Sequence, residues 1–271
     1  MTSPSQQIHM NQPRSGHGGK QMQWMSPPEQ RPLGCPPGLE YLTQIDQILI
    51  YGEVEPFQDL TGLPIVKDRL TNQYQIKNSL GQQVYFAYEE SEVYQRNCCG
   101  RTRAFSMHIT DNLSQEVIRI TRPFKCCAGY CWCADPESSC SMELHVESPP
   151  GQVVGYVKQT KSIWSPLFAV QDGNQQTVLK ISGPCNVCQS TCCTGDIDFR
   201  ILDQDGSQKI GRIAKQWGGM EREWAQHATT FRIEFPVDLD VKLKALLIGA
   251  TFLIDYMYFE RSKRKTSVRV M

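Results

Sequence analysis

The sequence predicts a mainly β protein in which a closed antiparallel sheet surrounds one C-terminal hydrophobic helix. Three observations lead to this fold class. A turn-forming cluster recurs before short strand-like runs, one long apolar stretch lies near the C-terminus, and 40% of the 271 residues are hydrophobic. Many short antiparallel strands favour a barrel or a sandwich. A closed sheet of eleven or twelve strands is too wide for its own side chains to fill, and the apolar helix can occupy its centre.

Residues 1–35 are rich in Gln, Ser, Pro, Gly and Met and show no periodicity, which predicts a disordered tail before a barrel at 36–260. Two short proline motifs, at 26–28 and 35–38, are of the kind that SH3 or WW domains bind, although an extended linker is the simpler interpretation. This region has no apolar segment of the signal-peptide type, so we expect the twelve cysteines in a reducing compartment.

The predicted strands are separated by five clusters of turn-forming residues. The clusters lie at 78–81, 111–114, 149–151, 172–174 and 203–206. The strand-like runs that follow them lie at 83–87, 117–120, 153–157, 177–181 and 209–213. Each cluster also has a candidate strand before it, such as 105–109 or 199–202, so the pattern predicts a meander of hairpins. Residues 41–51 mix apolar and polar positions and fit either a strand or a helix.

The apolar helix is expected at 243–259, within the stretch 241–259. Residues 245–259 span roughly 22 Å as a helix, whereas a hydrocarbon core is roughly 30 Å thick. Asp255 interrupts the stretch. Its length therefore favours a buried helix that is apolar on all sides, with a marginal membrane span as the alternative. A basic tail at 261–271 follows, and its candidate contacts for anionic lipid are Arg261, Lys263, Arg264 and Lys265.

Eleven of the cysteines fall into three groups. They are Cys98 and Cys99; Cys126, Cys127, Cys131, Cys133 and Cys140; and Cys185, Cys188, Cys192 and Cys193. The last group has a spacing that could ligate zinc. The middle group lies among aromatic and basic residues, which suits S-acylation near a membrane. Reduced thiols that pack as small hydrophobic side chains are the third interpretation, and the sequence leaves all three open.

The charge pattern and the scattered histidines argue against some functions. The formal net charge is zero and no recognition motif is present, so the sequence does not favour nucleic-acid binding. The five histidines are scattered, and no Cys–His or other catalytic set is found.

Four motifs give the chain a family resemblance. They are Pro-Pro-Gly-Leu-Glu-Tyr-Leu at 36–42, Arg-Asn-Cys-Cys-Gly at 96–100, Leu-Lys-Ile-Ser-Gly-Pro-Cys at 179–185 and Phe-Pro-Val-Asp-Leu-Asp-Val-Lys at 235–242. With them the chain resembles the phospholipid scramblases over about residues 36–260. The resemblance implies a twelve-stranded tubby-like barrel around the C-terminal helix, association with the cytoplasmic face of the plasma membrane, and palmitoylation in the loop that holds Cys126 to Cys140. It also implies calcium-dependent, non-specific movement of phospholipids between leaflets.

The resemblance places a twelve-residue calcium loop with its last position at Asp238. The family pattern has Asp, Asp and Gly where this chain has His227, Thr229 and Arg232, which weakens the expected oxygen cage. The alternation of Phe231, Ile233 and Phe235 instead favours a barrel strand. The candidate calcium ligands that remain are Asp238, Asp240 and Glu234.

Three functions follow as hypotheses. Lipid scrambling breaks no covalent bond, so it requires neither a nucleophile nor a general base, and the sequence leaves open whether the chain is an enzyme. A membrane-tethered module that binds lipid or other partners without scrambling is the alternative. A role in DNA binding is the third, and the zero net charge argues against it.

Overall fold

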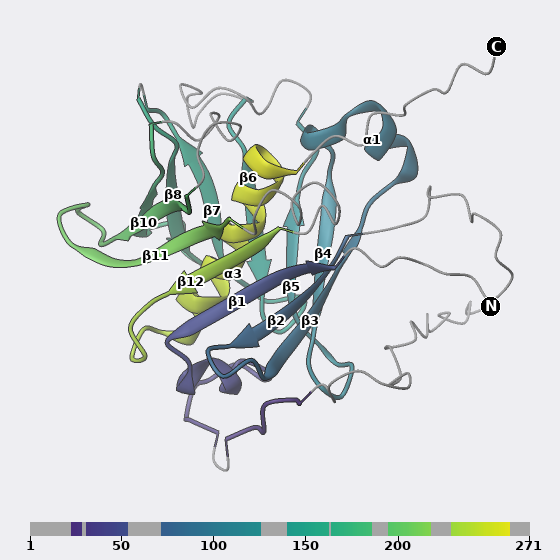
Figure 1. The fold of residues 1–271 in the computed structure, drawn as a ribbon, viewed down its shortest axis with the longest axis vertical. Coiled ribbons are helices and arrows are strands. Elements are labelled where there is room, and N and C mark those ends of the chain that lie inside the picture. Colours follow the sequence, from purple (N-terminus) through teal and green to yellow (C-terminus); the bar gives the residue numbers. More distant parts are fainter. Residues whose placement is uncertain are drawn as a thin grey trace, which may run out of the picture.

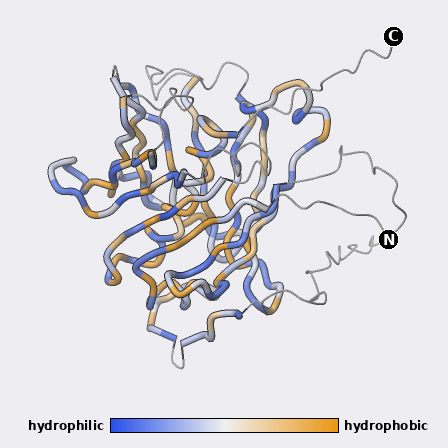
Figure 2. The backbone as a smooth tube through the Cα atoms, in the orientation of Figure 1, coloured by the Kyte–Doolittle hydropathy of each residue, from blue (hydrophilic) through white to orange (hydrophobic). Residues whose placement is uncertain are grey.

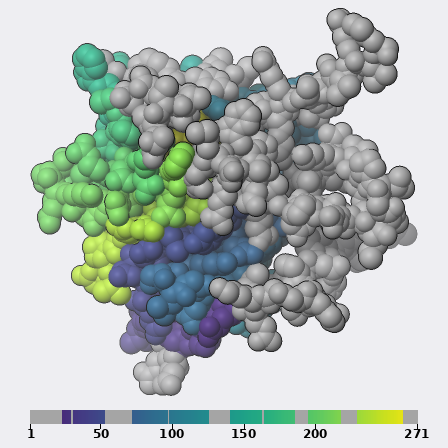
Figure 3. Space-filling model, in the orientation of Figure 1, coloured from purple at the N-terminus to yellow at the C-terminus, as the bar shows by residue number. Residues whose placement is uncertain are grey.

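The computed structural model describes residues 23–28, 31–53, 72–125, 140–162, 164–185, 195–217 and 229–260. Within these ranges, twelve antiparallel strands form a closed barrel in which each strand pairs with the next along the chain (Figure 1). The last strand closes on the first, with Gln47 opposite Glu234, and Figure 3 shows these two strands side by side on the surface. The predicted fold class is confirmed.

The elements have the following bounds. The strands are β1 (Gln47–Glu53), β2 (Gln73–Asn78), β3 (Gln83–Glu90), β4 (Phe105–Thr110), β5 (Glu116–Arg122), β6 (Glu143–Glu147), β7 (Val153–Thr160), β8 (Leu167–Asp172), β9 (Thr177–Ser182), β10 (Ile197–Leu202), β11 (Lys209–Gln216) and β12 (Thr230–Glu234). The helical segments are η1 (Glu40–Gln44), α1 (Val93–Cys98), η3 (Gly100–Thr102), α3 (Val241–Ile254) and η4 (Asp255–Phe259), the last of which is π-helical.

The five predicted hairpins are present, and four of them use the same local device. Their turns begin at Asn78, Asp111, Asp172 and Asp203, and one side-chain oxygen of each accepts hydrogen bonds from two backbone N–H groups of its own turn, at 2.8 to 3.1 Å. Such side chains mimic a backbone turn, which explains why short Asn- and Asp-containing clusters predicted the hairpins. The ambiguous stretch 41–51 contains both the end of the 3₁₀ helix η1 and most of β1.

The interior of the barrel is filled by α3. Residues 244–254 of this helix are all buried. Buried and more exposed positions alternate along β2 and β7, and Figure 2 shows hydrophobic and hydrophilic residues interspersed along the strands. Close approach is possible because two glycines lie at the contact. A Cβ on Gly249 would lie 2.8 Å from Val146, and one on Gly155 would lie 2.8 Å from Leu246. Full burial of one such aliphatic side chain contributes about 1.5–3 kcal/mol, so the predicted buried helix is also the main core element.

The alternative interpretation of this stretch was a membrane span. Across the described ranges, no helix combines the length and the hydropathy that crossing a membrane requires.

A buried lysine attaches the start of α3 to the rest of the chain. Nζ of Lys244 donates hydrogen bonds to the carbonyl oxygens of Leu42 (2.8 Å), Ile45 (3.0 Å) and Val237 (2.6 Å). Burial lowers the pKa of Lys244 to about 8. One turn earlier, the Asp240 side chain caps the helix by accepting from a backbone N–H at 2.7 Å. The helix start is therefore held by polar contacts and the rest of the helix by apolar ones.

Contacts with the barrel extend to residues before 36. Trp24 forms a parallel bridge with Gln83, and the backbone N–H of Met25 donates to the Gln83 carbonyl at 2.8 Å. Cys35 is buried. The domain limits placed at 35 and 260 from the sequence stay a prediction.

Candidate functional site

The two ends of the barrel are built differently. Five hairpin turns lie at one end, which we call the turn rim, together with the start of α3. At the other end, the loop rim, odd-numbered strands end and even-numbered strands begin, and α1, η3 and the end of η4 lie there (Figure 1). Nε of Arg101 in η3 donates to the Glu260 carbonyl at 2.7 Å, which joins this rim to the end of the helix.

A cluster of buried charges surrounds the end of the axial helix at the loop rim. Arg103 pairs with Glu89 at 2.8 Å and with Glu260 at 2.7 Å, and the Tyr256 hydroxyl donates to Glu89 at 2.7 Å. We call Glu89, Arg103, Tyr256 and Glu260 the helix-exit cluster. Burial alone would raise the pKa of Glu89, but hydrogen bonds from Arg103 outweigh it and lower that pKa. The cluster therefore keeps its charges and ties the helix end to β3 and to the short segment between η3 and β4.

A second arginine, Arg122, is fully buried beside this cluster. Its Nε and Nη2 donate to the Arg103 carbonyl, at 3.1 and 2.6 Å, and its guanidinium lies 4.6 Å from the ring centroid of Phe105 and 5.5 Å from that of Tyr256. Nη1 has no hydrogen-bond partner in the described part of the chain. Burial lowers the pKa of Arg122 to about 10. Aromatic faces and carbonyl oxygens thus replace a carboxylate partner here.

Asp255, the acid that interrupts the apolar stretch, lies inside the barrel. Its side chain is buried, and Oδ2 accepts a hydrogen bond from the Tyr74 hydroxyl at 3.2 Å. Burial, and next to it the charge of Glu260, raise the pKa of Asp255 to about 7. The acid is thus compatible with an apolar interior because a large fraction of it is neutral near pH 7.

The three predicted calcium carboxylates have different surroundings in the structure. Glu234 lies on the outer wall in β12 and accepts two hydrogen bonds from Arg212, at 2.8 and 2.9 Å. Asp240 caps α3, and Asp238 is exposed in the turn before it. In the described ranges no group of three or more His, Cys, Asp or Glu side chains could hold a metal ion. Calcium prefers at least six oxygens, so these acids do not fit a calcium site as they are arranged.

The other three residues of the calcium pattern lie in or near β12 or outside the described ranges. His227 lies outside the described residues, while Thr229 lies directly before β12. Arg232 lies in β12, where its guanidinium is 3.9 Å from Glu234. The strand predicted from the alternation at 231–235 is confirmed for Thr230–Glu234.

Most of the predicted lipidation and lipid-binding residues lie outside the described part of the chain. These are Cys126, Cys127, Cys131, Cys133, Arg261, Lys263, Arg264 and Lys265. Cys140 is described and is half-buried at the loop rim, before β6. Of the group with zinc-like spacing only Cys185 is described; it is exposed and follows β9 at the same rim.

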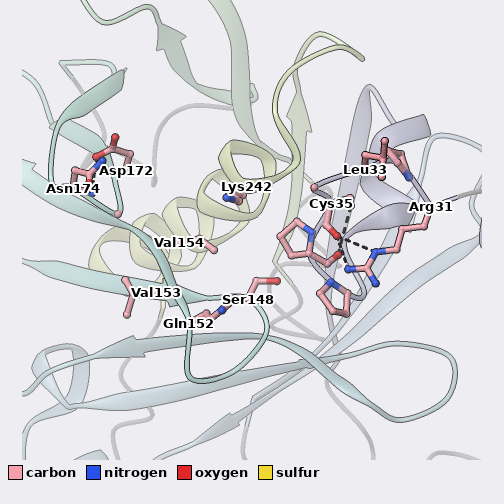
Figure 4. Close-up of a pocket in the computed structure, with 15 residues that line it drawn as sticks. Arg31, Leu33, Cys35, Ser148, Gln152, Val153, Val154, Asp172, Asn174 and Lys242 are labelled. Atoms are coloured by element: carbon pink, nitrogen blue, oxygen red, sulfur yellow. Dashed lines mark hydrogen bonds between the residues drawn. The ribbon is translucent and has the colours of Figure 1, made fainter.

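Sequence reasoning missed two features. The first is a groove of about 960 Å³ at the turn rim, between the segment 31–37, the β6–β7 and β8–β9 turns and Lys242 (Figure 4). Nε of Arg31 donates to the Cys35 carbonyl at 2.9 Å, so this cation is already held. The second is the helix-exit cluster. Both draw on segments far apart in the sequence, and no spacing or periodicity connects them.

A family model described as Scramblase matches residues 25–261, which is most of the chain. The chain belongs to the scramblase family. Among relatives, it is 49% identical to phospholipid scramblase 1 of Homo sapiens, over 90% of this chain and 72% of that protein. It is 46% identical to phospholipid scramblase 2 of Bos taurus, over 93% of this chain and 82% of that protein.

Other members of the scramblase family are also similar, including phospholipid scramblase family member 5 of Homo sapiens, at 43% identity over 85% of this chain and 80% of that protein. No solved structure matches. The resemblance found in the sequence motifs is confirmed. Two of those scramblase motifs, at 96–100 and 179–185, end at the loop rim, and the motif at 235–242 enters α3 at the turn rim.

Proposed function

We propose that this chain acts on a phospholipid membrane and moves phospholipids in both directions between its leaflets, without preference for the headgroup. One observation carries the proposal: relatives named phospholipid scramblases are 46–49% identical over about nine tenths of the chain. Lipid movement breaks no covalent bond, so it agrees with a sequence in which no nucleophile and base are paired.

The test is reconstitution of the purified full chain into vesicles that carry a fluorescent phospholipid. A membrane-impermeant reductant bleaches the outer leaflet only, so scrambling shows as loss of the protected inner-leaflet signal. We expect that loss with the wild-type chain and not with Gly155→Val, because a Cβ at this position would lie 2.2 Å from the Gln171 carbonyl and disrupt the barrel. An unchanged inner-leaflet signal with the wild-type chain would contradict scrambling.

A second function is favoured by the position of the helix. Residues 244–254 are buried by the barrel, and in this conformation they cannot also contact lipid chains. The alternative is therefore a membrane-tethered module that binds lipid without scrambling it. Vesicle binding without loss of the inner-leaflet signal would select this alternative.

Calcium dependence is carried over from the family resemblance, and we propose that any calcium effect is weak. Asp238 is exposed and available, whereas Glu234 is held by Arg212 and Asp240 by the helix start. Calorimetry on the full chain should show at most binding near millimolar, abolished in Asp238→Ala. Binding that survives this substitution would remove Asp238 from the proposal.

The remaining parts of the proposal concern location and partners. We place the chain at the cytoplasmic face of the plasma membrane, with palmitate on cysteines of the group Cys126, Cys127, Cys131, Cys133 and Cys140. Thiol-specific acyl exchange on Cys→Ser variants tests these sites one by one. For SH3 or WW partners, the motif at 26–28 is the better candidate, because Cys35 in the second motif is buried.

A further inference from the structure

Exposed hydrophobic side chains differ in kind between the two rims. At the turn rim the large exposed ones are aliphatic, among them Leu80, Leu113 and Val237. At the loop rim there are also aromatic ones, and those of the described residues are Tyr94 (73% exposed), Phe124 (46%), Trp164 (77%) and Trp217 (37%). In the described ranges, every exposed large aromatic side chain thus lies at the loop rim.

The topology explains why these four residues share a rim. Tyr94 follows β3, Phe124 follows β5, Trp164 follows β7 and Trp217 follows β11. Because the barrel is a closed antiparallel meander, all odd-numbered strands end on the same side. Residues that are 30 to 53 positions apart in sequence are thereby arranged around one opening of the barrel.

Charge separates the two rims as well. Acidic side chains at the turn rim outnumber the basic ones there, which include Arg31, Lys180, Lys209 and Lys242. The acids are Asp46, Asp172, Asp203, Asp205, Asp238 and Asp240. At the loop rim the described charges are mixed. The basic ones are Arg96, Arg101, Lys125, Lys161 and Lys215, and the acidic ones include Glu92, Glu143, Asp196 and Glu260. An anionic surface therefore repels the turn rim more than the loop rim.

The last described range of the chain also ends at the loop rim. Glu260 is held there by Arg101 and Arg103, and the sequence then continues with Arg261, Lys263, Arg264 and Lys265. Two exposed thiols, those of Cys98 and Cys185, lie in connections at the same rim. Exposed aromatic side chains, the exit toward basic residues and accessible thiols thus come together at one end of the molecule.

We propose that the loop rim is the surface that docks on a membrane, with Tyr94, Phe124, Trp164 and Trp217 in the interfacial layer of an anionic phospholipid bilayer. Tyr and Trp prefer this layer because the ring body is apolar and the polar atom stays hydrated. The turn rim then faces the aqueous phase. This inference rests on the proposed action on a phospholipid membrane, and it names the part of the surface that makes contact.

The experiment compares two triple variants of the full chain on vesicles of phosphatidylcholine and phosphatidylserine. The first variant carries Tyr94→Ser, Phe124→Ser and Trp164→Ser. The matched control carries Leu80→Ser, Leu113→Ser and Val237→Ser, which remove exposed apolar side chains from the turn rim. We expect the first to weaken vesicle binding about tenfold or more, and the control to bind as the wild type does. Circular dichroism verifies that both fold.

Hydrogen exchange on the wild-type chain gives a readout that needs no substitution. Added vesicles should protect amides in 91–104 and 161–166 and leave those in 111–115 and 203–208 unchanged. Equal binding by the two variants, or protection at the turn rim, would overturn the docking surface. Loss of binding only on substitution of the basic residues 261–265 would overturn it as well. If the chain binds through the loop rim but does not scramble, docking stands and the proposed function fails.

Discussion

At the residue scale, Asp255 is a buried acid whose protonation affects the stability of the barrel. Tyr74 donates a hydrogen bond to it in the barrel interior, and Glu260 lies near it at the loop rim. Burial raises the pKa of Asp255 from 3.8 to about 7. An acid whose pKa is raised on folding stabilises the fold below its unfolded pKa, and that contribution is lost as pH rises through the folded value. Stability therefore falls between about pH 4 and pH 7 on account of this group.

The substitution Asp255→Asn should remove this dependence. The amide oxygen still accepts from Tyr74, and no charge forms in the interior at high pH. We expect the variant to exceed the wild type by roughly 2–4 kcal/mol in free energy of unfolding at pH 8, and to match it near pH 4. Denaturant unfolding at both pH values measures the difference. A difference that is the same at pH 4 and pH 8 would show that the carboxylate carries no burial cost.

His108 has the second pH-sensitive environment, on the outer wall. Nδ1 lies 2.7 Å from Glu116, Nε2 lies 2.8 Å from Glu90, and the ring stacks on Tyr88. Hydrogen bonding to Glu116 is the main reason why the pKa of His108 is raised above 6.5. The contribution of the charged ring is complete below pH 6.5 and is lost as pH rises through the raised pKa.

Replacing this ring with an uncharged amide should therefore cost stability mainly at low pH. We expect His108→Gln to lose about 0.5–1 kcal/mol at pH 5.5, since solvent screens the pair, and much less at pH 9. Glu116 also accepts hydrogen bonds from Arg119, at 2.8 and 2.6 Å, and this pair remains in the variant. An equal loss at both pH values would mean that packing on Tyr88, and not charge, is what the histidine supplies.

At the scale of single elements, Asp240 at the start of α3 has either a structural or a metal-binding role. A substitution can distinguish the two. The Asp240 carboxylate accepts from the backbone N–H of Lys242 at 2.7 Å. Asp240→Ala should lower the free energy of unfolding by about 1 kcal/mol. The cap explanation requires the same loss with calcium and with a chelator. A loss that appears only with calcium would restore Asp240 as a ligand.

The contact between α3 and β6 gives a second prediction for an element. Gly→Ala in a helix usually stabilises by about 1 kcal/mol, but a Cβ on Gly249 would lie 2.8 Å from Val146. We expect Gly249→Ala to destabilise by about 1–3 kcal/mol. Val146→Ala should make room, so the double variant should be more stable than the sum of the two single changes predicts. Simple additivity would show that the helix shifts freely inside the barrel.

For the whole molecule, prediction from sequence succeeded where the physical cause is local. The hairpins follow from Asn and Asp side chains that bond to their own turns, and the axial helix follows from a stretch with no polar face. Pairing of β1 with β12 has no local signal, because it depends on how much twist accumulates around the sheet. The motif at 235–242 is one of the four that carry the family resemblance. Its position at the start of α3 became clear only from the structure.

The candidate site was the less predictable part for the same reason. Glu89, Arg103 and Tyr256 meet only because the barrel closes around the helix end, and no sequence pattern relates them. The calcium carboxylates were chosen by closeness in sequence. In the structure, neighbours in sequence point to an arginine, to a helix start and to solvent. Spacing alone thus could not decide which oxygens converge.

The pairing of β1 with β12, which closes the barrel, has a consequence for biosynthesis. Of the twelve strands, β1 is made first and β12 last, and the helix that fills the barrel is made after both. Contacts of such long range form late. On the ribosome the nascent chain is therefore an open sheet with an exposed apolar face, which chaperones must shield. The barrel can therefore close around its axial helix only after β1, β12 and the helix have all emerged from the ribosome.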